Sequence, residues 1–363
     1  MKKVLLATTM LVAGASIAAA EVTLSGDARM GILSSGEDNL LTLNTDEGDT
    51  VFTSRARVTF TLSGESDSGL SFGASFRADN ATGAASGTAG SVFISGAFGK
   101  LSMGDVDGAA QMATGHVSAT SLTGLNDWSE STFIGAGGLN AVAHTAVAVP
   151  GGFTDPIETN DPTLLYEYSA GDFTGYFSVT NPRDVLVNSA GPGVPAVNVL
   201  ASNAMAYAIG AKYTFGDYYA GLGYEKLSGY IAPLATAGIL PTAAVPADNT
   251  DMKHVVLTAG GTVAGVSVKG LYGKASGTLA GVNVVRPGFS GKQYALSASY
   301  TMNAITGTAF YTDDSGLGGT VAYGIGASYD LGGGAKLVGG IAQTKVAGPA
   351  DNTAYDLGVS FTF

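Results

Sequence analysis

The last nine residues of the chain alternate strictly between apolar and polar side chains. Tyr355, Leu357, Val359, Phe361 and Phe363 are apolar, and the residues between them are small or polar. Because successive side chains of a β-strand point to opposite faces, this segment has one apolar face and one wet face. A soluble protein turns such an apolar face to a core, whereas a membrane barrel turns it to lipid and the polar face to a water-filled lumen. The rest of the sequence has to decide between these two folds.

The start of the chain has the three-part layout of a secretory signal peptide. Two lysines precede an apolar stretch, and three alanines at positions 18–20 supply the small residues of a cleavage site. The alternative is a single membrane anchor, but the apolar stretch is short for a span of about 20 residues. We therefore expect a signal peptide over 1–20, a mature barrel chain over 21–363 and export across the inner membrane.

Composition excludes several functional classes. The chain contains no cysteine, so it has no disulfide framework, no thiolate nucleophile and no cysteine-based metal site. Its formal net charge of −12 argues against nucleic acid, whose binding requires basic patches. Charged residues make up 13% of the chain, about half of what soluble domains carry, and after position 20 no apolar run is long enough for a transmembrane helix. Apolar residues that alternate with polar ones, instead of forming long apolar runs, are typical of a transmembrane β-barrel.

Alternating segments recur along the whole chain. An even number of strands is required to close an antiparallel barrel of the bacterial type. We count sixteen such segments, at 22–32, 54–63, 70–78, 91–98, 100–105, 164–169, 173–180, 204–215, 217–225, 253–260, 265–273, 293–301, 304–311, 320–330, 335–342 and 353–363.

The connections between these segments alternate in length. Seven are short and rich in Gly, Asp and Asn, which tolerate the positive φ of tight hairpins, and eight are longer, among them 274–292. The strict rotation places short turns on one rim and long loops on the other, as in barrels with short periplasmic turns and long external loops. A sandwich with Greek-key connections would not sort its loops in this way. The sequence therefore predicts an all-β, sixteen-stranded antiparallel transmembrane barrel.

The strand framework also carries a resemblance to a known family. The chain resembles the sixteen-stranded general diffusion porins of alphaproteobacterial outer membranes. This resemblance implies a homotrimer, one pore in each barrel, and a third long loop that folds inward; Phe363 is similar to the family's outer-membrane assembly signal. The matching stretches are EVTLSGDARMGI at 21–32, SRARVTFTLSGESDSGLSFGASFRA at 54–78, VFISGAFGKLSMGD at 92–105, ASYDLGGGAKLVGGIA at 327–342 and YDLGVSFTF at 355–363.

The first three strands carry arginines that all have lumen parity. A charge on the lipid face costs roughly 2–4 kcal/mol at mid-membrane, so placement toward the lumen is favoured. We interpret these residues as the basic wall of a pore constriction; the alternative is that they pair with acids such as Asp27 and Asp79 and only hold the wall. They are Arg29, Arg55, Arg57 and Arg77.

The third loop, over 106–163, has the opposite character, because it contains acids and neither Lys nor Arg. If it enters the barrel, its acids face the arginines and create a transverse field that orients dipolar solutes. Asp105 and Asp107 are so near the strand end that they could instead be rim residues. Within this loop, the apolar segment 141–153 could line the lumen, cover a subunit contact or form a hairpin. The predicted constriction acids are Asp105, Asp107, Asp127, Glu130, Asp155, Glu158 and Asp161.

Catalysis is not indicated. The histidines are His116 and His144 in the third loop and His254 at a rim, and we interpret them as ordinary polar residues rather than members of a triad. We expect no cofactor and no resident metal. The predicted function is passive, outer-membrane diffusion of small hydrophilic solutes and ions with a modest cation preference. A substrate-selective channel and a secreted, soluble β-sandwich binding protein are the alternatives.

Overall fold

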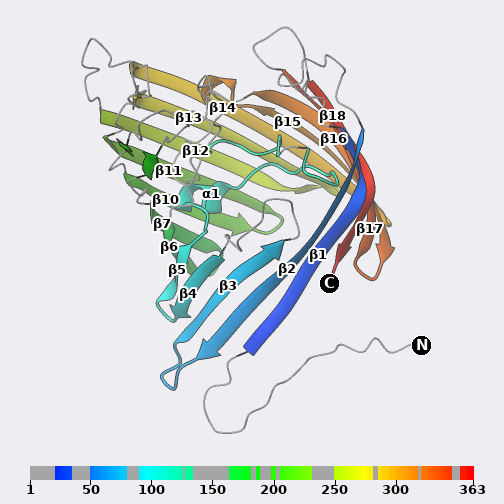
Figure 1. The fold of residues 1–363 in the computed structure, drawn as a ribbon, viewed down its shortest axis with the longest axis horizontal. Coiled ribbons are helices and arrows are strands. Elements are labelled where there is room, and N and C mark those ends of the chain that lie inside the picture. The colour runs from blue at the N-terminus through cyan, green and yellow to red at the C-terminus, as the bar shows by residue number, and fades with distance from the viewer. Residues whose placement is uncertain are drawn as a thin grey trace.

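The protein forms a closed antiparallel barrel whose first and last strands pair with each other (Figure 1). The sequence prediction of sixteen barrel strands is confirmed. The computed structural model describes residues 21–34, 50–79, 90–125, 127–133, 163–180, 185–188, 198–201, 205–230, 249–280, 285–317, 320–345 and 352–363. The barrel strands are β1 (Glu21–Ser34), β2 (Val51–Glu65), β3 (Ser71–Asp79), β4 (Gly90–Gly96), β5 (Gly99–Gly104), β6 (Thr163–Ala170), β7 (Phe173–Thr180), β10 (Met205–Phe215), β11 (Tyr218–Tyr230), β12 (Asn249–Val263), β13 (Val266–Ala280), β14 (Val285–Met302), β15 (Ile305–Asp313), β16 (Val321–Gly332), β17 (Ala335–Lys345) and β18 (Asn352–Thr362).

Tight turns join alternate pairs of strands, as predicted. Asn303 (φ 55°) and Ala264 (φ 50°) occupy the left-handed region in two of these turns. Asn tolerates that conformation through local hydrogen bonding, whereas Ala has no such compensation. Each turn fixes the register of its hairpin, so that alternation along the sequence becomes alternation between lumen and lipid.

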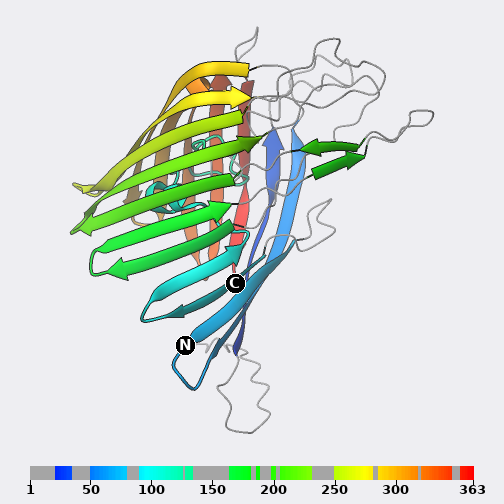
Figure 2. The same ribbon diagram turned by 90° about the vertical axis from the view of Figure 1, so that its left-hand side faces the viewer.

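Two connections differ from the prediction. The long loop expected over 274–292 is wrong, because β13 continues to Ala280 and β14 begins at Val285. A register shift between Gly277 and Leu279 absorbs the irregular part of this hairpin. The loop expected over 181–203 contains two further short strands, β8 (Val185–Asn188) and β9 (Asn198–Ala201), which pair outside the barrel (Figure 2).

The outer surface of the barrel is apolar. Side chains such as Ile325 (63% exposed) and Leu357 (51% exposed) point away from the lumen, which is the placement that a lipid environment stabilises. Near the short turns, the rings of Tyr213, Phe215 and Tyr218 stack in sequence on the outside. Such rings suit the membrane interface. Within the described ranges, no helix is both long enough and apolar enough to cross a membrane.

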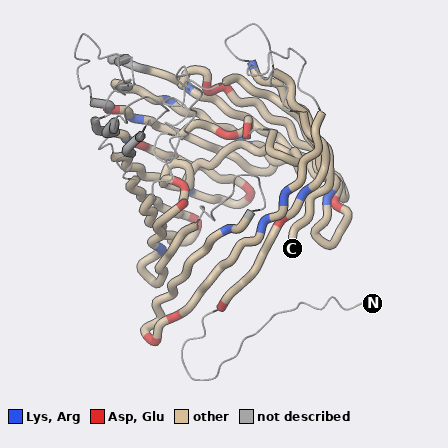
Figure 3. Tube along the Cα trace, in the orientation of Figure 1, with Lys and Arg blue, Asp and Glu red and all other residues tan. Residues whose placement is uncertain are grey.

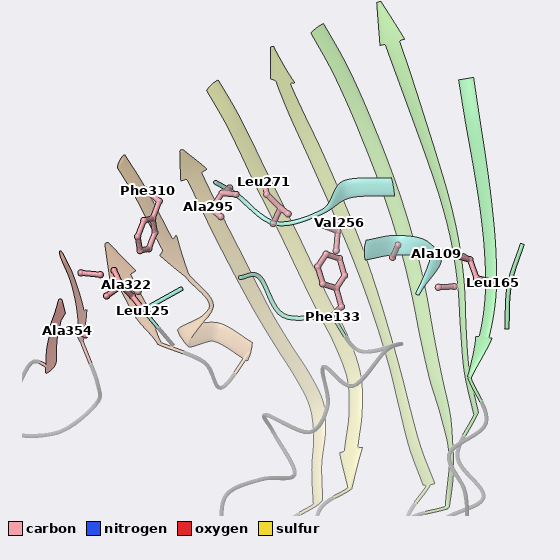
Figure 4. Packing of buried hydrophobic residues seen from close by; sticks show 14 residues of the cluster. Ala109, Leu125, Phe133, Leu165, Val256, Leu271, Ala295, Phe310, Ala322 and Ala354 are labelled. Carbon is pink, nitrogen blue, oxygen red and sulfur yellow. The ribbon is translucent and has the colours of Figure 1, made fainter. Parts of the chain in front are cut away.

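The third loop enters the barrel and packs against its inner wall. After β5 it forms a short helix, α1 (Ala109–Thr114), which contacts β7, β10, β11 and β12. Figure 4 shows the buried cluster between this loop and the wall, where Phe133 and Leu125 meet residues such as Val256 and Phe310. The inward fold that the family resemblance implied is thus seen in the structure.

Candidate functional site

Helix α1 lies directly against the backbone of the wall. Its first amide, Ala109 N–H, donates to Ser178 Oγ on β7 (2.9 Å). A β-carbon at Gly210 would lie 2.2 Å from the Ala109 carbonyl oxygen, and one at Gly223 would lie 2.6 Å from Ala110 Cβ. Only glycine permits this approach, so the wall is shaped to receive the helix.

Beyond the helix, the loop crosses the lumen face of the following strands through single hydrogen bonds. Ser118 N–H donates to Ser297 Oγ on β14 (3.0 Å), and Thr120 Oγ1 donates to Thr308 Oγ1 on β15 (2.8 Å). At Gly326 on β16 a β-carbon would collide with the Thr120 carbonyl oxygen. The loop therefore follows the wall closely from β7 to β16.

The tip of the loop is bound by one buried carboxylate on β18. Asp356, which is 3% exposed, accepts hydrogen bonds from Leu122 N–H (2.9 Å), Thr123 N–H (2.7 Å) and Thr123 Oγ1 (2.7 Å). Arg29 Nη1 on β1 donates to the Leu122 carbonyl oxygen (3.0 Å). Charge-assisted bonds of this kind are about twice as strong as neutral ones, so the tip is held at the seam where the barrel closes.

The returning part of the loop is anchored beside β14 and β15. Thr312 Oγ1 donates to the Trp128 carbonyl oxygen (2.8 Å), and Thr132 Oγ1 donates to Asp314 Oδ2 (2.8 Å). Asp314 follows β15 directly, and burial raises the pKa of its carboxyl group, although the Thr132 bond opposes this shift. Both limbs of the loop are therefore fixed to the same side of the barrel.

A buried chain of polar side chains continues this anchor. Glu225 and His254 are fully buried, and His254 Nδ1 lies 2.9 Å from Glu225 Oε2. His254 Nε2 lies 3.0 Å from Gln293 Nε2, while Gln293 also exchanges two hydrogen bonds of 2.9 Å with the backbone of Thr132. A ring that donates from Nδ1 and accepts at Nε2 satisfies every contact. The expectation that His254 is an ordinary rim residue is wrong, because the loop covers it.

A second histidine joins the two limbs of the loop. His116 Nδ1 accepts from Ser131 N–H (2.9 Å), and its Nε2 lies 3.0 Å from the side-chain amide of Gln111. Burial and the nearby charge of Lys269 lower the pKa of His116 to about 4. The ring is therefore neutral at pH 7, which the Ser131 contact requires, because a protonated ring cannot accept a hydrogen bond at Nδ1.

The arginines of the first three strands lie at lumen positions, as their parity predicted; Arg29 bonds the loop tip, whereas the other three lie on β2 and β3, beyond the strands that anchor the described part of the loop. Arg29 and Arg55 lie directly opposite each other in the β1–β2 pair, and Figure 3 shows the basic segments of these strands side by side. Arg55 Nη2 forms an ion pair with Asp27 Oδ2 (2.7 Å), which is the kind of contact that the wall-holding alternative expects. Arg57 lies opposite Asp27 and Asp79 in register, and Arg77 follows on β3.

Four of the predicted loop acids lie at the two ends of the described loop segment. Burial and Asp105 raise the pKa of Asp107; burial, Asp127 and Asp107 raise the pKa of Glu130. These effects show that folding brings acids from the outgoing and returning limbs into mutual electrostatic range. Asp155, Glu158 and Asp161, together with the apolar segment 141–153, lie outside the described residues. No metal-ligand group of three acids or histidines occurs in the parts that the structure describes.

Comparison with known proteins decides the family. The profile described as Gram-negative porin matches residues 7–349 of the chain. The chain belongs to the Gram-negative porin family. It is 36% identical to a porin of Rhodobacter capsulatus over 354 residues, which are 94% of this chain and 100% of the relative. A family member is a non-enzymatic, diffusive pore of the outer membrane, so neither catalysis nor a soluble β-sandwich remains an interpretation.

Solved porin structures share the fold. A porin structure refined at 1.8 Å resolution is 34% identical and has a TM-score of 0.65; the match covers 94% of this chain and 100% of that one. A triple mutant of Rh. blastica porin is 21% identical with a TM-score of 0.56 over the same shares of both chains. The sixteen-stranded barrel predicted from alternation and the porin family indicated by the resemblance are therefore both shown.

Sequence analysis missed the residues that hold the porin loop in place. Asp356 was recognised only as one polar member of an alternating strand. Its acidic character, at a lumen position inside the last strand, was a signal that could have drawn attention to it. Glu225, an acid inside a barrel strand, carried the same signal, whereas the neutral Gln293 carried none.

Proposed function

We propose that the pore admits small hydrophilic solutes and ions through a constriction between the arginine wall and the acidic loop. The observation that carries this proposal is the docking of the described part of the loop on the wall from β7 to β18, where Arg29 of β1 also contacts it, while the other three arginines lie on the strands that follow. The basic side is Arg29, Arg55, Arg57 and Arg77, and the described acidic side is Asp105, Asp107, Asp127 and Glu130.

Opposite charges across a narrow opening create a transverse field. Polar solutes can orient in that field, whereas apolar solutes lose hydration without compensation. The acids outnumber the basic residues over the whole chain, with a net charge of −12, and the third loop contributes no Lys or Arg. We therefore infer a modest cation preference, which the four arginines oppose.

Three further assignments belong to this proposal. The constriction loop extends over 106–163 and includes Asp155, Glu158 and Asp161. Residues 1–20, which lie outside the described residues, form a signal peptide that is removed on export. The mature barrel assembles as a homotrimer in outer-membrane lipid, which the family resemblance supports.

Single-channel recording in a planar bilayer, with a salt gradient, tests the proposal. We expect large ohmic steps that close in threes and a reversal potential displaced toward the cation equilibrium potential. An anion-directed potential would contradict the cation preference and would identify the arginines as dominant. Saturable flux would favour a substrate-selective channel instead, and an absence of conductance from folded protein would contradict the open pore.

A further inference from the structure

The outer surface of the barrel carries a basic cluster on the neighbouring strands β11, β12, β13 and β14 (Figure 2). Its four lysines have the parity of outward side chains such as Val255 and Tyr294, and the residues on either side of each lysine in the chain are buried. The lysines therefore point away from the lumen. The cluster consists of Lys226, Lys253, Lys274 and Lys292.

The register of the strands brings the four lysines together. Lys226 lies directly opposite Lys253, and Lys274 lies directly opposite Lys292, so the β-carbons of each pair are about 5 Å apart. Lys253 is opposite Ser276, which lies two residues from Lys274 on the same face. The two pairs are therefore diagonal neighbours, with β-carbons about 7 Å apart. The register joins the four side chains into one row across about 14 Å of the wall.

This row carries more charge than the strands around it balance. Among the described residues of β11–β14, Asp251 is the one acid with outward parity, and its Oδ1 lies 3.9 Å from Lys226 Nζ. No ion pair joins the other three lysines to a carboxylate in the described part of the chain. Like charges directly opposite each other destabilise a sheet. An anionic group from outside the chain would stabilise this arrangement.

The row lies at the edge of the apolar band. The lysines are about eight to ten residues from the short-turn ends of their strands, which corresponds to about 20–25 Å across the membrane for strands tilted by about 40°. The apolar band of such a barrel is about 25 Å tall.

Outward tyrosines mark the same boundary. Tyr224, Tyr272 and Tyr294 each lie two residues closer to the short turns than a lysine of the row, and the ring centroids of Tyr272 and Tyr294 are 5.4 Å apart. Aromatic girdles of this kind lie where the lipid headgroups begin. The ammonium groups are therefore at headgroup level on the long-loop side, which is the external side of such barrels.

We propose that Lys226, Lys253, Lys274 and Lys292 form a docking site for phosphate-bearing lipid headgroups of the external leaflet. Lysine binds phosphate as a point charge, and each direct pair supplies two ammonium groups to one phosphate. The lysine stems can lie along the apolar wall while their ends reach the headgroups. The tyrosine rings beneath them offer an apolar surface to the acyl chains.

Native mass spectrometry of the detergent-solubilised protein tests the site. The probe is dioleoyl phosphatidic acid, whose headgroup is a bare phosphate, and dioleoyl phosphatidylcholine is the lipid with the same chains and no net charge. We expect the wild type to bind phosphatidic acid at least about tenfold more tightly. In Lys253→Gln/Lys274→Gln, which removes one lysine from each pair, the dissociation constant for phosphatidic acid should rise about tenfold.

Two variants control for charge and for folding. Lys336→Gln/Lys345→Gln removes the same charge from β17, where Lys336 lies opposite Asp330 and Lys345 lies over the Tyr323 ring. It should change the dissociation constant less than about twofold. Lys253→Arg/Lys274→Arg keeps the charge of the row and should bind phosphatidic acid within about threefold of the wild type. If Lys253→Gln/Lys274→Gln does not fold, Lys274→Gln alone should weaken binding about threefold.

Four results would overturn the inference. One is equal affinity of the wild type for the two lipids, and another is an equal loss of phosphatidic acid binding in Lys253→Gln/Lys274→Gln and Lys336→Gln/Lys345→Gln, which would indicate a diffuse field. The third is displacement of the lipid by inorganic pyrophosphate at equal concentration, which would indicate a site for free phosphate. The fourth is an altered oligomeric mass of Lys253→Gln/Lys274→Gln with unchanged lipid binding, which would mean that a second copy of the chain covers the row.

Discussion

The two parts of the lumen wall differ in the volume of the side chains that they carry. The half covered by the third loop carries glycines and alanines where the loop backbone approaches, as at Gly210 and Gly326. The open part, β2 and β3, lies beyond the strands that anchor the described loop and carries long cationic side chains such as Arg55 and Arg77 at lumen positions. A wall that receives a loop must lose side-chain volume, whereas a wall that faces water can keep it.

The two halves also treat charge differently. On the covered half, the buried carboxylates of Asp356 and Glu225 contact hydrogen-bond donors of the loop or of a neighbouring side chain. At the edge of the open part, Arg55 lies opposite Arg29, which bonds the loop tip, and forms an ion pair with Asp27. Water screens the repulsion on the open half, whereas burial requires direct partners on the covered half. Charge anchors the loop on one wall, and under the proposed function it selects solutes on the other.

Removing the Asp356 carboxylate should have the largest effect on the contrast between the two walls, because it should release the loop tip from the covered one. Asp356→Ala leaves three loop donors without their acceptor, which costs about 4 kcal/mol and changes the ratio of docked to released loop tip roughly 1000-fold. We expect a noisy channel with a higher mean conductance. Asp330→Ala removes the same charge from an exposed turn and serves as the control. A steady wild-type conductance in Asp356→Ala would show that the tip has another anchor.

Acid should loosen the loop through His116. Its pKa is about 4 in the folded protein and 6.5 in an unfolded chain, so the unfolded state binds more protons between these values. The stability that the neutral ring contributes, about 3 kcal/mol, is present above pH 6.5 and is lost as the pH falls toward 4. His116→Gln cannot titrate. The difference in free energy of unfolding between wild type and His116→Gln should therefore change by this amount between pH 7 and 4.

The comparison of wild type with His116→Gln also cancels the contribution of the loop acids to the pH dependence of stability. The raised pKa values of Asp107, Glu130 and Asp314 act in the opposite direction, because these groups take up protons more readily in the folded state. They are present in both proteins, so their contribution cancels. A difference that is independent of pH would mean that His116 does not titrate between the two limbs.

Filling the covered wall should displace helix α1. A methyl group in Gly223→Ala would lie 2.6 Å from Ala110 Cβ and 2.8 Å from Ala110 Cα, neither of which can move alone. Overpacking of this kind costs about 2 kcal/mol, so hydrogen exchange of the α1 amides should accelerate about 30-fold. Gly307→Ala is the matched control, because no atom lies within 4 Å of its added carbon. Equal exchange in both variants would contradict the close fit of helix and wall.

Neutralising one charge on each side should shift ion selectivity in opposite directions. A unit charge about 10 Å from a permeating ion contributes about 0.4 kcal/mol in water, which is a factor of about two in permeability ratio. Arg55→Gln should raise the cation preference, and Glu130→Gln should lower it. Reversal potentials in a salt gradient measure both. Shifts of the same sign would mean that the two residues do not face a common ion path.

The sequence predicted the parts of the fold that depend on local patterning. Alternation located all sixteen barrel strands, and parity placed Arg29 and Arg77 in the lumen, because both signals repeat every two residues. It did not predict α1, whose six residues lack a side-chain cap. It also did not predict the pairing of Asp356 with Leu122 and Thr123, because 234 and 233 positions separate the partners. Anchoring contacts between residues so far apart produce no periodic pattern in the sequence.

The closure of the barrel has a consequence for the order of folding. Gly26 and Phe363 exchange backbone hydrogen bonds at the chain ends, and β1 pairs with β18 along eight residues. A growing chain therefore has two unsatisfied strand edges until β18 is available. Contacts of such sequence separation form slowly, because the whole chain must be brought into a ring first. The barrel can be completed only after β18 has been made, so the chain must be kept from aggregation along the way.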